Sequence, residues 1–412
     1  MQCILDLHIH SKHSRACSPQ LTLPNIDAVC RKKGVDIIAT GDFTYPQWFF
    51  DIKNELEEIQ TSGLYKLKSA LDNKIKFILS TELALIYKEN NKTRRIHIVI
   101  HAPNIQAVEE LNRYLDKKYN IRSDGRPILG MKSHELVKLC LSINPKFLIY
   151  PAHIWTPWFS VFGSKSGFDS MEECFQDQVE HIYAYETGLS SDPEMNWRVS
   201  ELDKLTILSN SDAHSLINIG REATVMDLNE ISYNTIYDAI KNNNIKSTIE
   251  FYPEEGMYHY DGHRDCEIRF SPEQTKKNKK LCPKCKKSLT VGVMYRVEEL
   301  ADRPVGFKPK NVKPFIKLVE LDKIIAQSLG IKSRSSKKVV AEYNNLISRA
   351  GNELDILINS DTEKLKNIST NKICEGIKRA RNGKLIIEPG FDGQYGSIKI
   401  FQEQKSSNNY WG

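Results

Sequence analysis

The stretch DLHIHSKHS, residues 6–14, places two histidines two positions apart. Alternate side chains of a β-strand point to the same face, so we expect Asp6, His8 and His10 to share one face of a strand. Two imidazoles on one face can direct their nitrogens at a single point, as a metal ion requires. Because ordinary surface or core histidines could form the same pair, a metal site needs further ligands elsewhere in the chain.

Six more apolar runs in the first 250 residues end in, or next to, residue types that bind metals, and helix-like stretches separate them. The seven runs are CILDLHIH, VDIIATGD, KIKFILSTE, RIHIVIH, KFLIYPAH, HIYAYET and LTILSNSDAH. The candidate ligands at their ends are His8, His10, Asp42, Glu82, His97, His101, His153, Glu186, Asp212 and His214. This alternation predicts repeated βα units in a parallel sheet or barrel. Active sites of α/β barrels lie at the carboxyl ends of the strands, so we expect these side chains to converge on one metal centre.

Length and composition indicate a soluble protein of two or three domains. The chain has 412 residues, of which 40% are hydrophobic and 27% are charged. It contains neither an apolar run of the roughly 18 residues that a membrane span needs nor an export signal, so we expect a cytoplasmic protein without membrane contact. Nine cysteines, an odd number, favour reduced thiols, apart from any subset whose spacing fits a metal.

The motifs HRDC (263–266) and CPKC (282–285) form such a subset. Their spacing predicts a zinc ribbon with one structural Zn²⁺. The four predicted ligands are His263, Cys266, Cys282 and Cys285, and His259 is an alternative to His263. The other interpretation is two unrelated sites of reduced cysteines.

Positive charge is concentrated around these motifs. Residues 264–338 contain 20 Lys and Arg against 8 Asp and Glu, whereas the whole chain has a net charge of +6. A basic segment beside a less basic catalytic unit is typical of nucleic-acid binding, although a solvated surface has the same composition. The run KRAR at 378–381 adds to the basic surface.

The C-terminal part reads as helices at 315–330, 337–359 and 370–383, followed by a strand pair within 384–401. The tail SSNNYWG, residues 406–412, is expected to be frayed. We therefore predict three domains: a catalytic barrel at 1–250, a zinc ribbon at 251–312 and a helical DNA-binding domain with a short β-hairpin at 313–412.

The motifs DLHIHS, GD at Asp42, STE at Glu82, RIHIV, PAH and SDAH together resemble the PHP family, named for polymerase and histidinol phosphatase. The resemblance implies a distorted (βα)7 barrel with two or three metal ions that hydrolyses phosphoesters. A narrower resemblance covers nearly the whole chain. The stretches PAHIWTPWFSVFG, YETGLSSDPEMNWR, YHYDGHRDC with CPKC, RVEELADRP and PGFDGQYGSIKIF are similar to those of the endonuclease Q family.

The endonuclease Q resemblance implies a nuclease that cleaves DNA 5′ to deaminated bases (uracil, hypoxanthine, xanthine) and abasic sites. Damaged DNA is then the expected partner, with a sliding clamp as a further candidate, and we expect a monomer. Two rival interpretations are a PHP phosphatase acting on a small phosphorylated metabolite and a DNA-binding protein with an inactive PHP domain.

The resemblance also implies a ligand set. One ion would be held by His8, His10, Glu82 and Asp212, and Glu82 would bridge to a second ion held by His97 and His153. A third ion has fewer matching ligands. Phe43 stands where many PHP proteins have a histidine, and His13 matches only loosely the histidine that the family has shortly after the first pair. Asp42 and His214 are its remaining candidates. We expect Glu82, Asp212 and His214 to be catalytic, and imidazole with carboxylate donors favours Zn²⁺, with Mn²⁺, Fe²⁺ or Mg²⁺ as replacements.

Substrate contacts are predicted in the loop after His153 and near Asp212. Trp155, Trp158 and Phe159 could form an aromatic wall on which a flipped base stacks, or they could pack the loop onto the barrel. Arg221 could hold a phosphate or form a surface ion pair. Glu186 could position water or substrate, or it could form ordinary hydrogen bonds. Asp6 could orient an imidazole or cap a strand, and His101 is a reserve ligand.

Overall fold

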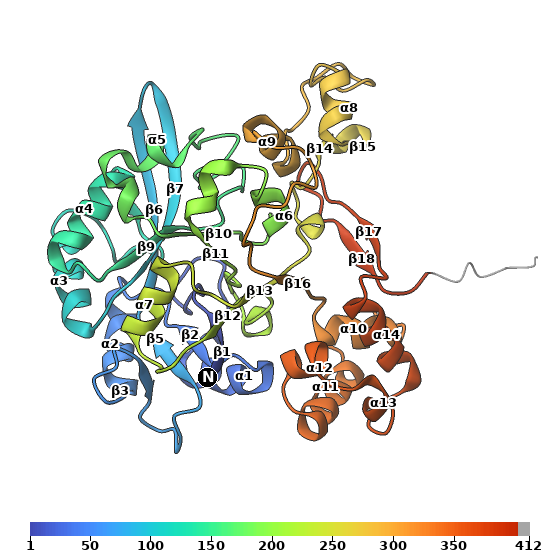
Figure 1. Ribbon diagram of the computed structural model, residues 1–412, viewed down its shortest axis with the longest axis horizontal. Coiled ribbons are helices and arrows are strands. Elements are labelled where there is room, and N and C mark those ends of the chain that lie inside the picture. The colour runs from blue at the N-terminus through green and yellow to red at the C-terminus, as the bar shows by residue number, and fades with distance from the viewer. Residues whose placement is uncertain (403–412) are drawn as a thin grey trace, which may run out of the picture.

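The structure is a computed structural model that describes residues 1–402, so the tail SSNNYWG lies outside the described residues. A large mixed α/β unit carries the N-terminal residues, and two smaller units lie beside it (Figure 1). Within residues 1–402, no helix is long and apolar enough to cross a membrane.

The large unit is built from short strands and the helices between them. Its strands are β1 (Gln2–Asp6), β2 (Ile37–Ala39), β3 (Leu56–Glu58), β4 (Tyr65–Leu67), β5 (Lys76–Ile78), β6 (Ser80–Glu89), β7 (Lys92–His101), β8 (Ile128–Leu129), β9 (Leu148–Pro151), β10 (Ala184–Glu186), β11 (Thr206–Leu208), β12 (Ala223–Asp227) and β13 (Ser247–Glu250). Its helices are α1 (Leu23–Lys33), α2 (Pro46–Glu55), α3 (Ile105–Asp116), α4 (Ser133–Ile143), α5 (Met171–Phe175), α6 (Pro193–Asn196) and α7 (Tyr233–Lys241).

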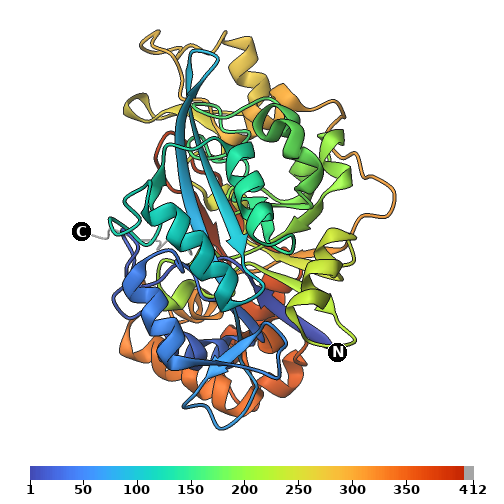
Figure 2. The ribbon, with the colours of Figure 1, turned by 90° about the vertical axis from the view of Figure 1, so that its left-hand side faces the viewer.

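Each of the seven predicted runs contains a strand, but the strands do not form one parallel sheet. They are distributed over three sheets. The first is ordered β16-β13-β12-β1-β2-β5-β4-β3, where β16 is Phe315–Lys317, and the others are ordered β8-β6-β7-β9 and β10-β11. Strand β7 runs antiparallel to both β6 and β9. Figure 2 shows β6 and β7 as one long hairpin. The prediction of parallel strands throughout was wrong here, because β6 and β7 are joined by a tight turn at Asn90 and Asn91, both with positive φ, instead of by a helix.

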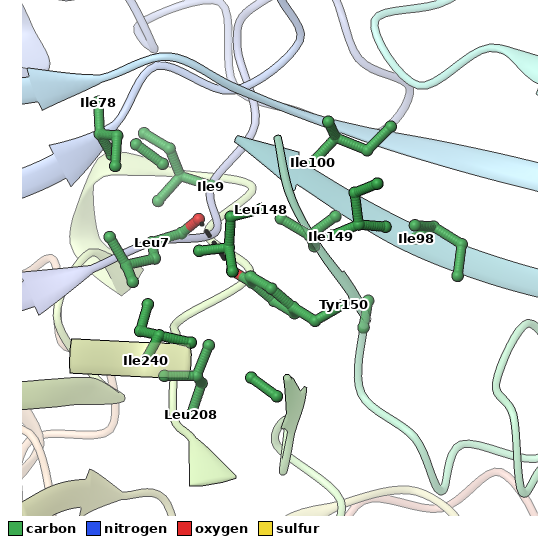
Figure 3. Packing of buried hydrophobic residues seen from close by; sticks show 14 of the residues in the cluster. Leu7, Ile9, Ile78, Ile98, Ile100, Leu148, Ile149, Tyr150, Leu208 and Ile240 are labelled. Atoms are coloured by element: carbon green, nitrogen blue, oxygen red, sulfur yellow. Dashed lines mark hydrogen bonds between the residues drawn. The ribbon is translucent and has the colours of Figure 1, made fainter. Parts of the chain in front are cut away.

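One apolar core fills the space between these sheets. Figure 3 shows side chains of β5, β7, β9 and β11 meeting there with Leu7 and Ile9, which follow β1, and with Ile240 of α7 beside them. Leu7, Tyr150 and Leu208 are each fully buried, and the Tyr150 hydroxyl donates a hydrogen bond to the carbonyl of Leu7 at 3.5 Å. Packing of this kind holds the ends of separate strands in fixed positions, which a site assembled from several strands requires.

The remaining elements belong to the zinc unit (residues 261–300, with the predicted zinc ligands), to the helical unit (residues 321–381), to one strand pair and to one extra strand. They are β14 (Asp261–His263), β15 (Ile268–Phe270), α8 (Pro272–Lys277), α9 (Val293–Leu300), β16 (Phe315–Lys317), α10 (Leu321–Ser328), α11 (Lys337–Ala350), α12 (Glu353–Ile358), α13 (Thr362–Leu365), α14 (Asn371–Arg381), β17 (Ile386–Glu388) and β18 (Ser397–Lys399). Strand β16 pairs in parallel with β13, so the large sheet continues past residue 313. Helices α10–α14 surround a second apolar core.

A buried ion pair joins the helical unit to the large unit. Lys33, at the end of α1, lies 2.8 Å from Glu353 of α12, and both side chains are almost fully buried. Gly34 follows with a φ of 91°, and a Cβ there would lie 2.1 Å from Asn352 Oδ1. Glycine is therefore required at this close contact between the two units.

Candidate metal centre and the adjoining cavity

Four of the predicted ligands meet directly beyond the carboxyl end of β1. His8, His10, Glu82 and Asp212 each offer a ligand atom, and these atoms lie within 4.8 Å of one another. His10 Nε2 is 3.2 Å from both Glu82 Oε2 and Asp212 Oδ1. The backbone brings Asp212 to this point through an isolated parallel bridge between Ile9 and Ala213.

Glu82 also belongs to a second group, with His97 and His153. Its Oε1 is 2.8 Å from His97 Nδ1 and 3.3 Å from His153 Nε2, while its Oε2 faces the first group. One carboxylate thus presents an oxygen to each group, the arrangement that a bridging ligand of two ions requires.

The chemistry of the donors fits cations. The buried atoms His8 Nε2, His10 Nε2, Glu82 Oε1 and Asp212 Oδ1 have no hydrogen-bond partner. His8 Nε2, His10 Nε2 and Asp212 Oδ1 belong to the first group, and Glu82 Oε1 faces the second. Buried polar atoms are nearly always satisfied, so unsatisfied ligand atoms in these groups indicate sites for ions.

Carboxylates behind the imidazoles hold their orientation. His8 Nδ1 lies 3.1 Å from Glu186, which also accepts a hydrogen bond from the backbone N–H of His153 at 2.9 Å. His10 Nδ1 lies 3.0 Å from Asp42. A proton on Nδ1 leaves the Nε2 lone pair free for a metal, which is the usual role of such carboxylates. Sequence reasoning placed Glu186 at the site without assigning it this contact.

The two candidates for a third ion lie outside both ligand groups. Asp42 Oδ2 accepts hydrogen bonds from the Ser11 amide and from the hydroxyls of Ser11 and Ser14, at 2.7 to 2.8 Å. His214 lies on the rim of the site, where its side chain is 30% exposed and its ring centroid is 4.6 Å from that of His10. In this structure Asp42 therefore supports His10, and ligation by Asp42 or His214 stays a prediction.

The expectation that His101 is a reserve ligand was wrong. Its ring is buried against Tyr150, and its Nε2 lies 3.0 Å from the Tyr150 hydroxyl. Because β7 runs antiparallel to its neighbours, its carboxyl end points away from the metal centre. His101 is four residues beyond His97 on this strand, which is a distance of about 13 Å.

Asp6 and Arg221 brace the loop that carries Asp212. Asp6 accepts hydrogen bonds from the backbone N–H groups of Ser211 and Gly220, at 3.0 and 2.9 Å. Arg221 donates two hydrogen bonds to the carbonyl of Ser211, at 3.0 and 2.9 Å. Neither side chain orients an imidazole, and the contacts of Arg221 do not support a phosphate clamp.

Arg126 is a site residue that sequence reasoning missed. Its Nη1 lies 2.9 Å from Glu82 Oε2, and its side chain is 22% exposed. It comes from the loop before β8, and no strand end or histidine motif marks it. An arginine that pairs with the shared carboxylate and reaches the surface can also contact an anionic substrate.

The electrostatics of the centre favour charged carboxylates. Burial raises the pKa of Glu82, but His97, Arg126 and His8 together hold it well below its usual range. Burial also lowers the pKa of His97 to about 4, against the opposing effect of Glu82. Burial lowers the pKa of His8 and His10, but the carboxylates around them, Glu186 and Asp42 first, raise it well above the usual value. Metals bind neutral imidazole and ionised carboxylate, so a cation bound by these two rings would displace their protons.

Only part of the predicted aromatic wall is available to a substrate. Trp155 is fully buried, and its Nε1 donates to Asn196 Oδ1 at 2.7 Å, so its assignment to substrate binding was wrong. Trp158 is 36% exposed and lies edge-on to Tyr258, with ring centroids 5.4 Å apart. Phe159 packs on the ring of His97 at 4.5 Å.

Trp158 lines a cavity of about 280 Å³ whose wall includes the candidate ligands His153 and Asp212. The rest of the lining is largely apolar, with Leu189, Met257 and Val293 among its residues. A volume of this size next to a metal centre can hold one flat aromatic ring system, such as a nucleobase.

The zinc-ribbon prediction is matched by the side-chain positions. His263, Cys266, Cys282 and Cys285 form one group whose ligand atoms lie within 4.8 Å of one another. His259 is outside this group: it is buried and lines the cavity. The geometry therefore selects His263 over His259.

Comparisons with known proteins agree with this architecture. Residues 320–384 match the family model of the MJ0043 C-terminal domain. The MJ0043 protein of Methanocaldococcus jannaschii is 37% identical over 258 residues, which are 61% of this chain and 32% of that protein. The chain thus spans about a third of the length of this relative. The YqxK protein of Bacillus subtilis is 28% identical over 414 residues, covering 96% of this chain and 98% of YqxK.

Two solved structures are similar over essentially the whole chain. The lesion-specific endonuclease of Pyrococcus furiosus, PfuEndoQ, has a TM-score of 0.86 and 30% identity, with full coverage of both chains. A complex of endonuclease Q with a 27-mer duplex substrate containing an abasic lesion has a TM-score of 0.85 and 30% identity, covering 99% of this chain and all of the other.

The similarity to the two endonuclease structures identifies the class of the protein as a hydrolase, and its clustered imidazole and carboxylate groups could hold metal ions. Within that class, the full-length similarity in sequence and fold places the chain in the endonuclease Q family, as the sequence motifs predicted.

Proposed function

We propose that this protein is a DNA repair endonuclease that nicks the strand 5′ to deaminated bases (uracil, hypoxanthine and xanthine) and to abasic sites. The observation that carries the proposal is the pair of ligand groups sharing Glu82 next to the apolar cavity lined by Trp158. His153 and Asp212 belong both to the ligand groups and to the cavity lining, so phosphodiester chemistry and an extruded base would be neighbours in this proposal.

The ligands assigned to the metal centre are His8, His10, Glu82 and Asp212 for one ion and Glu82, His97 and His153 for the other. Divalent cations bound there supply Lewis acid polarisation of the phosphate and activation of water near neutral pH. Imidazole with carboxylate donors favours Zn²⁺, and Mn²⁺ or Mg²⁺ are replacements.

The protein residues contribute position and charge. Glu186 and Asp42 fix the imidazoles of His8 and His10, and the Asp6 contacts hold the Asp212 loop. Arg126, paired with Glu82 and partly exposed, would face the phosphate and offset its charge. His214 stands at the open rim, where it would meet the reacting phosphodiester.

Several exposed cations would contact the DNA backbone outside the cavity. Lys277, Lys279, Lys286 and Lys287 of the zinc unit are exposed, as is Lys378 on α14. Arg381 is not part of this surface, because it donates to the carbonyls of Ile356 and Leu357. Backbone neutralisation by such residues makes affinity fall steeply with salt.

The test is incubation with Zn²⁺, Mn²⁺ or Mg²⁺ and labelled duplexes that contain one uracil, hypoxanthine, xanthine or abasic site. Intact DNA and a small phosphomonoester serve as comparison substrates. Cleavage confined to the 5′ side of the modified nucleotides is expected. Hydrolysis of the small ester alone would favour a metabolite phosphatase, and DNA binding without turnover under any of the three metals would favour an inactive binding module.

A further inference from the structure

We propose that Tyr395 enters the base stack of duplex DNA and takes the place of the nucleotide that leaves it. The proposal rests on the nuclease function argued above and names the residue that would open the duplex. Tyr395 lies in the turn between β17 and β18, far in sequence from the metal ligands, yet it lines the same cavity as His153 and Asp212.

Tyr395 is the most exposed aromatic side chain in the described part of the chain. It is 78% exposed, whereas Trp158, the other exposed aromatic of the cavity, is 36% exposed and packs edge-on against Tyr258. No ring within residues 1–402 stacks on Tyr395. Trp158 therefore belongs to the wall of the cavity, and Tyr395 stands free at its edge.

The turn that carries Tyr395 is fixed to the cavity by its backbone. Gly390 N–H donates to the carbonyl of Glu254 at 2.8 Å, Gly393 N–H to that of Met257 at 3.0 Å and Gly396 N–H to that of Glu255 at 3.1 Å. The approach is so close that a Cβ on Gly396 would lie 2.1 Å from the Glu254 carbonyl oxygen.

Two further contacts attach the turn to the zinc unit. The Arg264 amide donates to Asp392 at 2.7 Å, and Arg269 Nη1 donates to the Pro389 carbonyl at 2.9 Å. Figure 1 shows β17 and β18 between this unit and the helical unit. Tyr395 is thus an exposed ring on a rigid support, placed between two basic units.

These features match what extrusion of a base requires. When a nucleotide leaves the stack, its neighbours lose a stacking partner, and proteins that distort DNA commonly fill such gaps with an apolar side chain. The inserted side chain must stand beside the pocket that receives the base and must be held firmly enough to resist displacement. Among the residues that line the cavity, Tyr395 meets both conditions.

The test compares Tyr395→Ala and Tyr395→Phe with the unchanged protein on two DNA substrates. One is a fully paired duplex with a single uracil, and the other carries the same uracil in an unpaired bulge, where no stacked pair must be opened. Tyr114→Ala is the matched control, because Tyr114 is another exposed tyrosine (36%) but lies on α3, away from the cavity.

We expect Tyr395→Ala to lower kcat/KM on the duplex about 10- to 100-fold, or about 1.4 to 2.7 kcal/mol, and on the bulge less than 3-fold. Tyr395→Phe and Tyr114→Ala should stay within 3-fold of the unchanged protein on both. The melting temperature should not change, since the Tyr395 ring is exposed. As a second readout, 2-aminopurine next to the uracil should brighten on binding of the unchanged protein and less with Tyr395→Ala.

An equal loss on both substrates, or no loss on the duplex, would overturn the role of Tyr395. Failure of the unchanged protein to cut either substrate would instead overturn the nuclease proposal. The two failures are therefore distinguishable.

Discussion

The substitution Glu186→Gln tests whether the ligand geometry depends on the carboxylate behind His8. Three donors point at the Glu186 carboxylate: His8 Nδ1 at 3.1 Å, the His153 amide at 2.9 Å and Asn210 Nδ2 at 3.0 Å. A glutamine offers one oxygen and replaces the other with an NH₂ group that faces these donors. At least one hydrogen bond is lost, and the tautomer of His8 is no longer fixed.

Loss of a carboxylate that orients a metal-binding histidine costs about 10- to 100-fold in metal affinity. We therefore expect the Kd for Zn²⁺ at the catalytic centre to rise by that factor, or about 1.4 to 2.7 kcal/mol. Cleavage of uracil-containing duplex should fall at limiting metal and recover at saturating metal. The ribbon's zinc should be unaffected, because its ligands are remote.

The assay is a zinc titration against a competing chelator, run beside a cleavage assay over a range of metal concentrations. Glu222→Gln is the matched control: Glu222 is equally buried and also accepts from a backbone N–H, that of Phe251 at 3.1 Å, without contacting a candidate ligand. An unchanged zinc affinity for Glu186→Gln, or a loss of activity that saturating metal does not restore, would refute the reasoning.

Three further predictions concern activity, stability and pH. Asp212→Asn should abolish cleavage. It should leave the affinity for DNA in a gel-shift assay nearly unchanged, because in this proposal the exposed lysines supply most of that affinity. A cleavage rate near that of the unchanged protein would contradict the role of Asp212 as a metal ligand. Trp155→Ala should lower the free energy of unfolding by about 3 to 5 kcal/mol, as removal of a fully buried tryptophan does. Trp158→Ala should change the melting temperature by no more than a few degrees but should reduce cleavage. Equal effects of the two substitutions on stability would show that the burial of these residues is misassigned. Burial raises the pKa of Glu250 to about 7. Between the ordinary pKa of a glutamate, near 4.5, and pH 7, the folded state therefore keeps a proton that the unfolded state releases. The stability from this group is fully present below pH 4.5 and is lost as the pH rises through 7. Between pH 5 and pH 8, denaturant unfolding of the metal-free protein should show a loss of stability that is about 2 to 3 kcal/mol smaller in Glu250→Gln. An equal loss in both proteins would exclude Glu250 as a source.

The sequence supported the ligand set because metal chemistry constrains residue type and spacing. His8 and His10 are recognisable as a pair, and the predicted ribbon motifs HRDC and CPKC are recognisable by their spacing. Each set is brought together in the structure. The choice of His263 over His259 required coordinates, since both positions are compatible with a ribbon in sequence.

Other features depend on tertiary structure and left little trace in sequence. The direction of β7 is set by the Asn90–Asn91 turn, and reading every run as a parallel strand made His101 look equivalent to His97. Trp155 and Trp158 stand three residues apart in one aromatic loop, yet one is in the core and the other lines the cavity. Arg126 lies in a loop without periodicity, so only its distance to Glu82 identifies it.

The β6–β7 hairpin supplies Glu82 and His97 from facing strands, with Glu82 opposite Val99 and Ala84 opposite His97. Since facing residues share a side of the sheet, both ligands emerge on the same side only while this pairing is kept. Deleting one residue from either strand between the ligands and the tip would turn one ligand away from the other. Insertions and deletions in this hairpin are therefore tolerated only when both strands keep the alternation of their side chains between the two faces. Natural variation in length should accumulate at the outer end of the hairpin.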